Sequence, residues 1–372
     1  MRARKRLALS AAAWLLPTMF IRRNLEPVDF VFVCHPRDVV DIGKRFPSVK
    51  YFPETLIVRL FDKLWPIPVC PLEFVLANGS RCVGVMIAVP STAQMLLADR
   101  ERAKKKFLSA VQLADRMGAK IVCLGGLSGS LTDGGQFILS KGVKCNVTTG
   151  HSFTVATLIE TIRKACETRH LRLNEARLAV VGACGSIGAA CCRWLLREEK
   201  INQLILIDLK EEALAKLKGE LAGDQGLTLR ISTDLNSLQD ADIVVVATNN
   251  PNLIIQPDHL RSGSIVIDDA QPPNVSPAGL NTKGILLAWG GCVNVPGVRC
   301  PVDLGLFGQD AVFSCLGECL LLCGHGLYEN YTIGPVDIIK VKRLLLLASD
   351  LGFSLPPLQA FGRVAGGSEC AN

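Results

Sequence analysis

The sequence lacks the patterns that mark several specialised classes of protein. It has no internal repeats and no low-complexity tract. Charged residues make up only 20% of the chain and hydrophobic residues 49%, a balance that argues against disorder and favours a compact globular core. The length of 372 residues allows two or three domains of ordinary size.

No Cys-x-x-Cys pair occurs among the 15 cysteines, so we expect no zinc ribbon, no thioredoxin-like redox site and no other metal site. Secreted disulfide scaffolds are short and rich in loops, and this chain is neither. Many of the cysteines lie in apolar runs, where a free thiol behaves as a small hydrophobic side chain. We therefore expect a reducing, cytoplasmic location with most thiols in the core.

The chain has no strong excess of one charge, since 41 basic residues face 34 acidic ones and the formal net charge is +7. Much of the basic excess lies near the N-terminus and in residues 100–106. Scattered basic residues usually form a solvated face, and no nucleic-acid-binding motif is present. We expect no nucleic acid as a partner.

The N-terminal apolar run, Leu7 to Ile21, is too short to cross a bilayer comfortably and is broken by Pro17. Arg22 and Arg23 follow where a signal peptide would have small residues at its cleavage site. Two interpretations of residues 1–23 stay open. The segment lies on a membrane surface, or it is a packed N-terminal helix of a soluble enzyme.

Strands and helices alternate through the rest of the chain, which predicts an α/β fold. After the N-terminal segment 1–25, an α/β domain is expected over residues 26–150. Its predicted strands are 28–34, 81–90 and 119–124, with a helix over 91–117. A helix is expected from about residue 151 to 169, with Ser152 or Thr154 as its N-cap.

A Rossmann-type, doubly wound parallel sheet is predicted for residues 151–310. Short apolar strands separated by helices give this pattern. The expected strands are 178–181, 203–208, 241–247, 264–268 and 284–289. Residues 311–372 are expected to form C-terminal helices.

A glycine turn, Gly182-Ala183-Cys184-Gly185-Ser186-Ile187-Gly188, follows the first of these strands and opens a helix. Gly182, Gly185 and Gly188 permit the tight turn and let the backbone approach a pyrophosphate, with Ser186 and Ile187 beside it at the helix N-terminus. The spacing predicts a dinucleotide site. The alternative is that the glycines serve only close packing of helix and strand.

Two further segments are expected to contact the dinucleotide. Asp208 ends the second strand, where an acidic side chain accepts hydrogen bonds from a ribose and so favours NAD(H) over NADP(H). Lys210, two residues later, would offset part of the repulsion between Asp208 and a 2′-phosphate. The alternative is that Asp208 binds no ribose and is simply a strand-end residue in an exposed turn. Ala247, Thr248 and Asn249 follow the fourth strand, where the nicotinamide half is usually contacted.

Several segments together resemble one family, the long-chain acyl-(acyl-carrier-protein) reductases, which form fatty aldehydes. The resemblance runs from about residue 82 to 325, with a weaker match upstream. The segments are His35-Pro36-Arg37-Asp38, Leu124-Gly125-Gly126, Thr148-Thr149-Gly150, the glycine turn, Cys192-Arg193-Trp194-Leu195, Gly290-Gly291 and Ser314-Cys315-Leu316-Gly317-Glu318.

The resemblance implies an N-terminal domain that helps to hold an acyl chain, a Rossmann domain that binds NADP(H), and a cysteine that forms an acyl-enzyme. Cys315 matches the family cysteine, and Glu318 also matches. The implied partner is an acyl thioester of acyl carrier protein or of coenzyme A. A thiolate would attack the thioester, and hydride transfer would then release an aldehyde. His151 and His325 are candidate acids or structural residues.

Other interpretations of the same residues stay open. Cys315, Cys319 and Cys323 share one helical face, which alone predicts core packing. A helix N-terminus at Cys315 is expected to lower its pKa and favour the thiolate. The rival functions are a two-domain dehydrogenase built like shikimate dehydrogenase and a dinucleotide-binding sensor without turnover.

Overall fold

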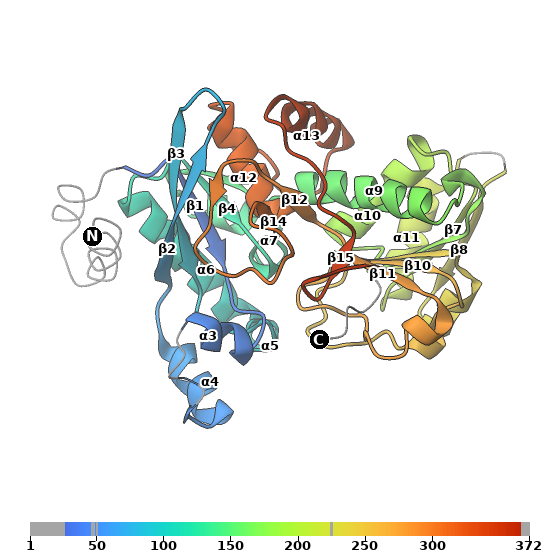
Figure 1. Cartoon of the computed structure of the whole chain (residues 1–372). Helices are drawn as coiled ribbons and strands as arrows, with labels where there is room; N and C mark the ends of the chain where they lie inside the picture. Colours follow the sequence, from blue (N-terminus) through green and yellow to red (C-terminus); the bar gives the residue numbers. More distant parts are fainter. Residues whose placement is uncertain (1–26, 46–48, 50, 224–225, 366–372) are drawn as a thin grey trace, which may run out of the picture.

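The computed structural model describes residues 27–45, 49, 51–223 and 226–365. The two interpretations of residues 1–23 concern a segment outside the described residues. Within the part that is described, no helix combines the length and the apolar composition needed to cross a membrane. The described chain contains two six-stranded sheets, which lie side by side with helices between and around them (Figure 1).

The first sheet has the order β13-β2-β3-β1-β4-β5. Its strands are β1 (Phe30–Cys34), β2 (Ile67–Val75), β3 (Arg81–Ala88), β4 (Ile121–Leu124), β5 (Asn146–Thr148) and β13 (Val298–Arg299). The three predicted strands are present as β1, β3 and β4, and they pair in parallel. β2 and β13 run antiparallel at one side of this sheet.

The sequence did not predict β2, because two prolines interrupt it. Pro68 and Pro71 lie in its first half, and the pairing with β3 shifts between Pro68 and Cys70. On its other side β2 pairs with β13 only at Glu73 and Phe74. The prolines therefore lie where a missing N–H removes few ladder hydrogen bonds.

The helical segment expected over 91–117 is present, but it is divided into α5 (Ala93–Ala98) and α6 (Arg100–Arg116). The chain breaks at Asp99, whose carboxylate accepts a hydrogen bond from the N–H of Arg102 at 3.0 Å. Aspartate is a favoured N-cap because it satisfies an N–H that the helix leaves unpaired. The break turns α6 so that its apolar face covers the first sheet.

The second sheet is parallel throughout and has the strand order of a Rossmann fold, β11-β10-β9-β6-β7-β8. Its strands are β6 (Leu178–Val181), β7 (Gln203–Ile207), β8 (Thr228–Ser232), β9 (Ile243–Val246), β10 (Ile265–Asp268) and β11 (Leu286–Trp289). The α/β fold class and the Rossmann-type sheet are thereby confirmed. β8 was missed because it is an edge strand with mostly exposed side chains.

Helices α9 (His151–Thr168), α10 (Ser186–Arg197) and α11 (Glu211–Leu221) cover one face of the second sheet. Their apolar residues form one continuous core with α12 (Ser314–Gly324) and with one face of the first sheet. In Figure 1, α9 crosses above the second sheet, and its N-terminal end points toward α12. One core cluster therefore joins the two sheets, while the opposite face of each sheet packs in a cluster of its own.

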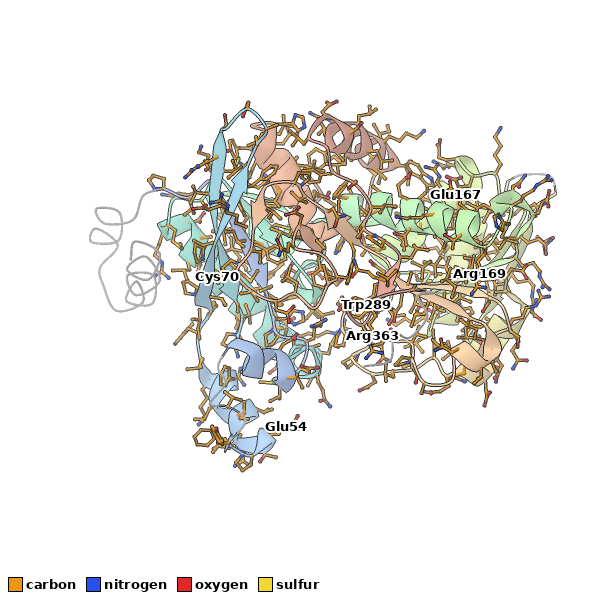
Figure 2. The ribbon with its side chains drawn as sticks, viewed as in Figure 1. Glu54, Cys70, Glu167, Arg169, Trp289 and Arg363 are labelled. Atoms are coloured by element: carbon orange, nitrogen blue, oxygen red, sulfur yellow. The ribbon has the colours of Figure 1, made fainter. Side chains whose placement is uncertain are left out.

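The chain returns to the first sheet after β11. β12 (Cys292–Asn294) pairs with β14 (Ala311–Phe313), and β14 leads directly into α12. The C-terminal helices expected over 311–372 are present as α12 and α13 (Ile338–Asp350). A short hairpin of β15 (Gln359–Ala360) and β16 (Arg363–Val364) then packs beside β11, where Phe361 of the hairpin lies 5.3 Å from Trp289 between ring centroids. Figure 2 labels Trp289 on β11 and Arg363 on β16.

Candidate functional site

Two glycines of the predicted dinucleotide turn are required by the packing around them. A Cβ on Gly182, whose φ is +78°, would lie 2.4 Å from the carbonyl oxygen of Ala247. A Cβ on Gly188 would lie 2.2 Å from the carbonyl oxygen of Gly182. The packing alternative therefore explains Gly182 and Gly188, whereas Gly185 has its nearest neighbour at 3.2 Å.

The turn ends at the N-terminus of α10. Gly185 is the N-cap and offers no side chain to the first turn of the helix. The helix begins with Ser186, Ile187 and Gly188, whose N–H groups precede the first intrahelical hydrogen bond, from the N–H of Ala189 to the carbonyl of Gly185 (2.9 Å). Such N–H groups bind phosphate oxygens, so the turn fits the pyrophosphate of a dinucleotide.

Asp208 lies directly after β7 and is hydrogen-bonded to the glycine turn. Its carboxylate accepts the N–H of Cys184 at 2.9 Å and the N–H of Leu209 at 2.8 Å. The side chain is only partly buried, so it remains accessible from outside. Lys210, two residues later, is exposed at the N-terminus of α11.

A cavity of about 470 Å³ lies between the two sheets. Five of the predicted site residues line it: Ile187, Ala247, Thr248, Asn249 and Cys315. The opposite wall comes from the first sheet and from two nearby helices, α3 (Val39–Arg45) and α4 (Glu54–Lys63), and it is apolar. Its side chains include Phe32, Ile42, Phe61, Ile67, Val69 and Met86.

Cys315 lies in the first turn of α12, against the N-terminus of α9. Gly150, which precedes α9, has a φ of +76°, and a Cβ there would lie 2.3 Å from the Cα of Cys315. Ser152 and Thr154 do not cap α9, so that prediction is wrong; the residue before His151 must be glycine for α12 to approach this closely.

The expectation that the helix terminus makes Cys315 a thiolate is also wrong. Burial raises the pKa of the Cys315 thiol to about 11, although hydrogen bonds from the backbone of Gly126 and Leu316 act in the opposite direction. Removing a thiolate from water costs more here than these two donors return. The resting side chain is therefore a neutral thiol at neutral pH.

The other two cysteines of α12 lie away from the cavity. Cys319 is completely buried and Cys323 is almost so, and both pack in the shared core. Cys315 is only partly buried and opens to the cavity. Among the described residues, no group of three or more histidine, cysteine or acidic side chains is arranged to hold a metal ion.

Glu318 joins α12 to α9 and to β5. Its carboxylate is fully buried and accepts the hydroxyls of Thr148 and Thr332, the latter at 2.7 Å. It also accepts the N–H of Phe153, in the first turn of α9, at 2.9 Å. The glutamate thus caps a helix whose own N-cap, Gly150, has no side chain, and it fixes the position of Cys315 one turn earlier.

The two candidate histidines differ in position. His151 lines the cavity, and its Nδ1 lies 3.3 Å from the Oγ of Ser186. Burial lowers the pKa of His151 to about 4, so the ring is neutral at neutral pH. The Nε2 of His325 lies 3.1 Å from the carbonyl oxygen of Leu347, and His325 does not line the cavity.

Three charged or polar residues of the cavity were not assigned a role from the sequence. His35 accepts the N–H of Leu127 at 3.1 Å through Nε2. Arg37 pairs with Asp41 at 2.7 Å and donates to the Oε1 of Gln271 at 3.2 Å, so it joins the two halves of the cavity wall. The third is Asp269, directly after β10. An acidic residue at the carboxyl end of a parallel strand was the available signal.

Comparison with known proteins supports the assignment of the Rossmann part, and one relative is similar over most of the chain. The family profile described as shikimate / quinate 5-dehydrogenase matches residues 164–287. The chain is 28% identical over 334 residues to the long-chain acyl-[acyl-carrier-protein] reductase of Synechococcus elongatus, covering 86% of this chain and 94% of that protein. It is 26% identical to the aminotransferase PigE of Serratia sp., covering 77% of this chain and 34% of that protein.

Among solved structures, the malic enzyme of Entamoeba histolytica is similar over 96% of this chain and 67% of its own length, with 12% identity and a TM-score of 0.44. The sequence similarity to the Synechococcus elongatus reductase confirms the resemblance to the acyl-(acyl-carrier-protein) reductases that the motifs indicated. Together with the Rossmann strand order, the sequence similarities support the assignment of this chain as an NAD(P)-dependent oxidoreductase that resembles the long-chain acyl-(acyl-carrier-protein) reductases.

Proposed function

We propose that this protein reduces a long-chain acyl thioester of acyl carrier protein or coenzyme A to a fatty aldehyde, through an acyl group carried on Cys315. One observation carries the proposal. The same cavity contains the Cys315 thiol, the exit of β9 where a Rossmann enzyme contacts its nicotinamide, and an apolar wall that suits an acyl chain. The similarity to an acyl-[acyl-carrier-protein] reductase supports the choice of substrate.

The first step is thioester exchange at Cys315. Its sulfur bonds to the acyl carbon, the bond from that carbon to the carrier sulfur breaks, and the proton of the Cys315 thiol ends on the departing carrier thiol. Because the resting thiol is neutral, it must lose its proton as the sulfur attacks, and the overall charge does not change because one thiol replaces another. Packing of α12 against α9 holds the sulfur at the cavity wall while the chain lies along the apolar side.

The dinucleotide would be held by the glycine turn, with the pyrophosphate at Ser186, Ile187 and Gly188 and a ribose at Asp208. Its nicotinamide would supply the hydride near Ala247, Thr248 and Asn249. These residues come from α10 and from the end of β9, whereas the acyl-chain wall comes from the first sheet. Substrate and dinucleotide therefore reach Cys315 from opposite sides of the cavity.

Mass spectrometry of the intact protein tests the proposal. With acyl thioester and no reductant, the protein should gain the mass of one acyl group, mapped to Cys315. Cys315→Ser should lose both this adduct and aldehyde formation but still bind dinucleotide. Cys319→Ser is the matched control: it changes a buried thiol one turn away and should keep the adduct.

The same experiment separates this function from the two rivals. A shikimate-dehydrogenase-like enzyme needs no nucleophilic thiol, so it would form no adduct and would retain activity after thiol alkylation. A dinucleotide sensor would bind the cofactor without turning over any thioester. An adduct on another cysteine, or full aldehyde production by Cys315→Ser, would contradict the role given to Cys315.

A further inference from the structure

Two consecutive carboxyl groups at the end of β10 have different surroundings. Asp268 is buried and accepts three backbone N–H groups, from Ala270 at 3.1 Å, Asn274 at 2.8 Å and Val275 at 3.0 Å. These hydrogen bonds hold the turn that follows the strand. Among the residues that the structure describes, none forms a hydrogen bond with the carboxyl group of Asp269, and this side chain lines the cavity that contains Cys315.

The backbone places Asp269 next to the end of β9 and close to the start of α12. Its N–H donates to the carbonyl oxygen of Val246 at 2.8 Å, next to the start of the expected nicotinamide segment. A Cβ on Gly291, whose φ is +60°, would lie 2.3 Å from the Oδ1 of Asp269, so the carboxyl group lies directly against this glycine. The carbonyl oxygen of Gly291 in turn accepts the N–H of Ser314 at 2.7 Å, immediately before Cys315.

The surroundings of Asp269 favour its neutral form. Burial raises the pKa of this carboxyl group well above its ordinary value, and the neighbouring Asp268 raises it further. The other titratable groups that face it are the thiols of Cys191 on α10, Cys292 on β12 and Cys315 on α12. His151 and the ion-paired Arg37 line the same cavity. A carboxyl group in its protonated form donates a hydrogen bond instead of repelling negative charge.

We propose that the neutral carboxyl group of Asp269 donates a hydrogen bond to the acyl oxygen while the thioester on Cys315 is reduced. The inference rests on the proposed function and adds a catalytic residue to it. When the acyl carbon accepts a hydride, the C=O π electrons move to the oxygen, which gains the negative charge that Asp269 stabilises. The C=O bond then re-forms, the carbon–sulfur bond breaks, and the Cys315 thiolate takes a proton from water.

The two histidines on the cavity wall are less suited to this role. His35 accepts the N–H of Leu127 through Nε2, and its Nδ1 lies 2.9 Å from the carbonyl oxygen of Pro36. His151 faces Ser186 at the start of the dinucleotide helix. Both nitrogens of His35 and the Nδ1 of His151 therefore have partners, whereas the Asp269 carboxyl group has no hydrogen-bond partner among the described residues.

The test measures reduction separately from acylation. Protein carrying the acyl adduct is prepared without reductant and then mixed with NADH or NADPH, and loss of the adduct and aldehyde release are followed in a single turnover. Asp269→Leu should form the adduct but release aldehyde about 100-fold to 1,000-fold more slowly, the usual effect of losing one oxyanion donor. Asp269→Asn keeps a donor of the same shape and should lose only about tenfold.

The pH dependence distinguishes catalysis from a structural role. Aldehyde release by the wild type should fall as the pH rises through the pKa of Asp269, because the ionised carboxylate no longer donates; Asp269→Asn should not show this fall. Asp350→Asn is the control, since this exposed carboxyl group at the end of α13 does not line the cavity and its variant should behave as wild type.

The outcomes are distinguishable. If wild-type protein forms no adduct on Cys315, the proposed function fails. If the adduct forms but Asp269→Asn and Asp269→Leu release aldehyde at the wild-type rate with the wild-type pH profile, only the role of Asp269 is overturned.

Discussion

At the scale of single residues, the reactivity of Cys315 depends on a balance between burial and hydrogen bonding. Burial raises its pKa to about 11, so at pH 7 only about one thiol in 10,000 is a thiolate. Because the pKa of Cys315 is raised in the folded protein, its reactivity toward alkylating agents should increase only as the pH rises and more thiolate forms. Alkylation of Cys315 by iodoacetamide should become about tenfold faster for each pH unit between 7 and 10.

Peptide mapping of the same sample supplies an internal control. A hydrogen bond from the Cys70 thiol lowers the pKa of Cys300 to about 7, and Cys300 is partly exposed. Its alkylation rate should level off above about pH 8, while that of Cys315 still rises. A plateau for Cys315 below pH 9 would show that its thiolate is stabilised more than the burial of the site indicates.

A second residue-scale prediction concerns the choice of dinucleotide. Asp208 accepts the N–H of Cys184 and is proposed to lie at the ribose of the dinucleotide, where its charge would repel a 2′-phosphate. Asp208→Asn keeps an acceptor for the turn and removes the charge, so the affinity for NADPH relative to NADH should rise by about tenfold. Titration with both dinucleotides measures this ratio, and Asp240→Asn, at an exposed position after β8, is the control. An unchanged ratio would remove Asp208 from the ribose site.

At the scale of elements, the sequence pattern predicted the strands that are buried along their whole length. It missed strands that contain prolines or expose their side chains. β6, β9 and β10 are entirely buried and read as apolar runs. β2 contains two prolines, and β8 has exposed side chains. The N-cap of α9 was also missed, because its capping carboxylate, Glu318, comes from a helix more than 160 residues away.

That long-range cap leads to a prediction about stability. Glu318→Leu leaves the Thr148 and Thr332 hydroxyls and the Phe153 N–H without their acceptor, which should lower the free energy of unfolding by about 2–4 kcal/mol. Glu318→Gln should cost less, since its amide oxygen still accepts. Chemical denaturation measures both. Glu167→Gln, at the exposed end of the same α9 (Figure 2), should change nothing. Equal stability of Glu318→Leu and wild type would show that the cap is dispensable.

At the scale of the whole molecule, the sequence could place the glycine turn, the β9 exit and Cys315 on their elements, but it could not bring them to one cavity. Their meeting depends on β12, β13 and β14, short strands that carry the chain from the second sheet back to the first. Asp269 was overlooked for the same reason. Only the folded chain shows that Gly291 and the start of α12 lie next to its carboxyl group.

The division of the cavity between the two sheets predicts that chain-length selectivity and dinucleotide binding are separable. Ala88, the last residue of β3, lines the apolar wall and is partly buried. Ala88→Phe should fill part of this wall and exclude the end of a long acyl chain. Each methylene kept out forfeits about 0.8 kcal/mol, or about fourfold in kcat/KM. A loss of three methylenes should therefore lower kcat/KM for a long chain by about 50-fold relative to a short one.

Dinucleotide affinity should not change in Ala88→Phe, because the glycine turn and Asp208 belong to the second sheet. Ile339→Phe, which enlarges a side chain that is 75% exposed on α13, is the matched control and should leave both properties unaltered. Steady-state kinetics over a series of acyl thioesters, with dinucleotide titration alongside, measures the two effects. If Ala88→Phe reduced all chain lengths equally, the acyl chain would have to lie elsewhere, and the apolar wall formed by the first sheet would serve another purpose.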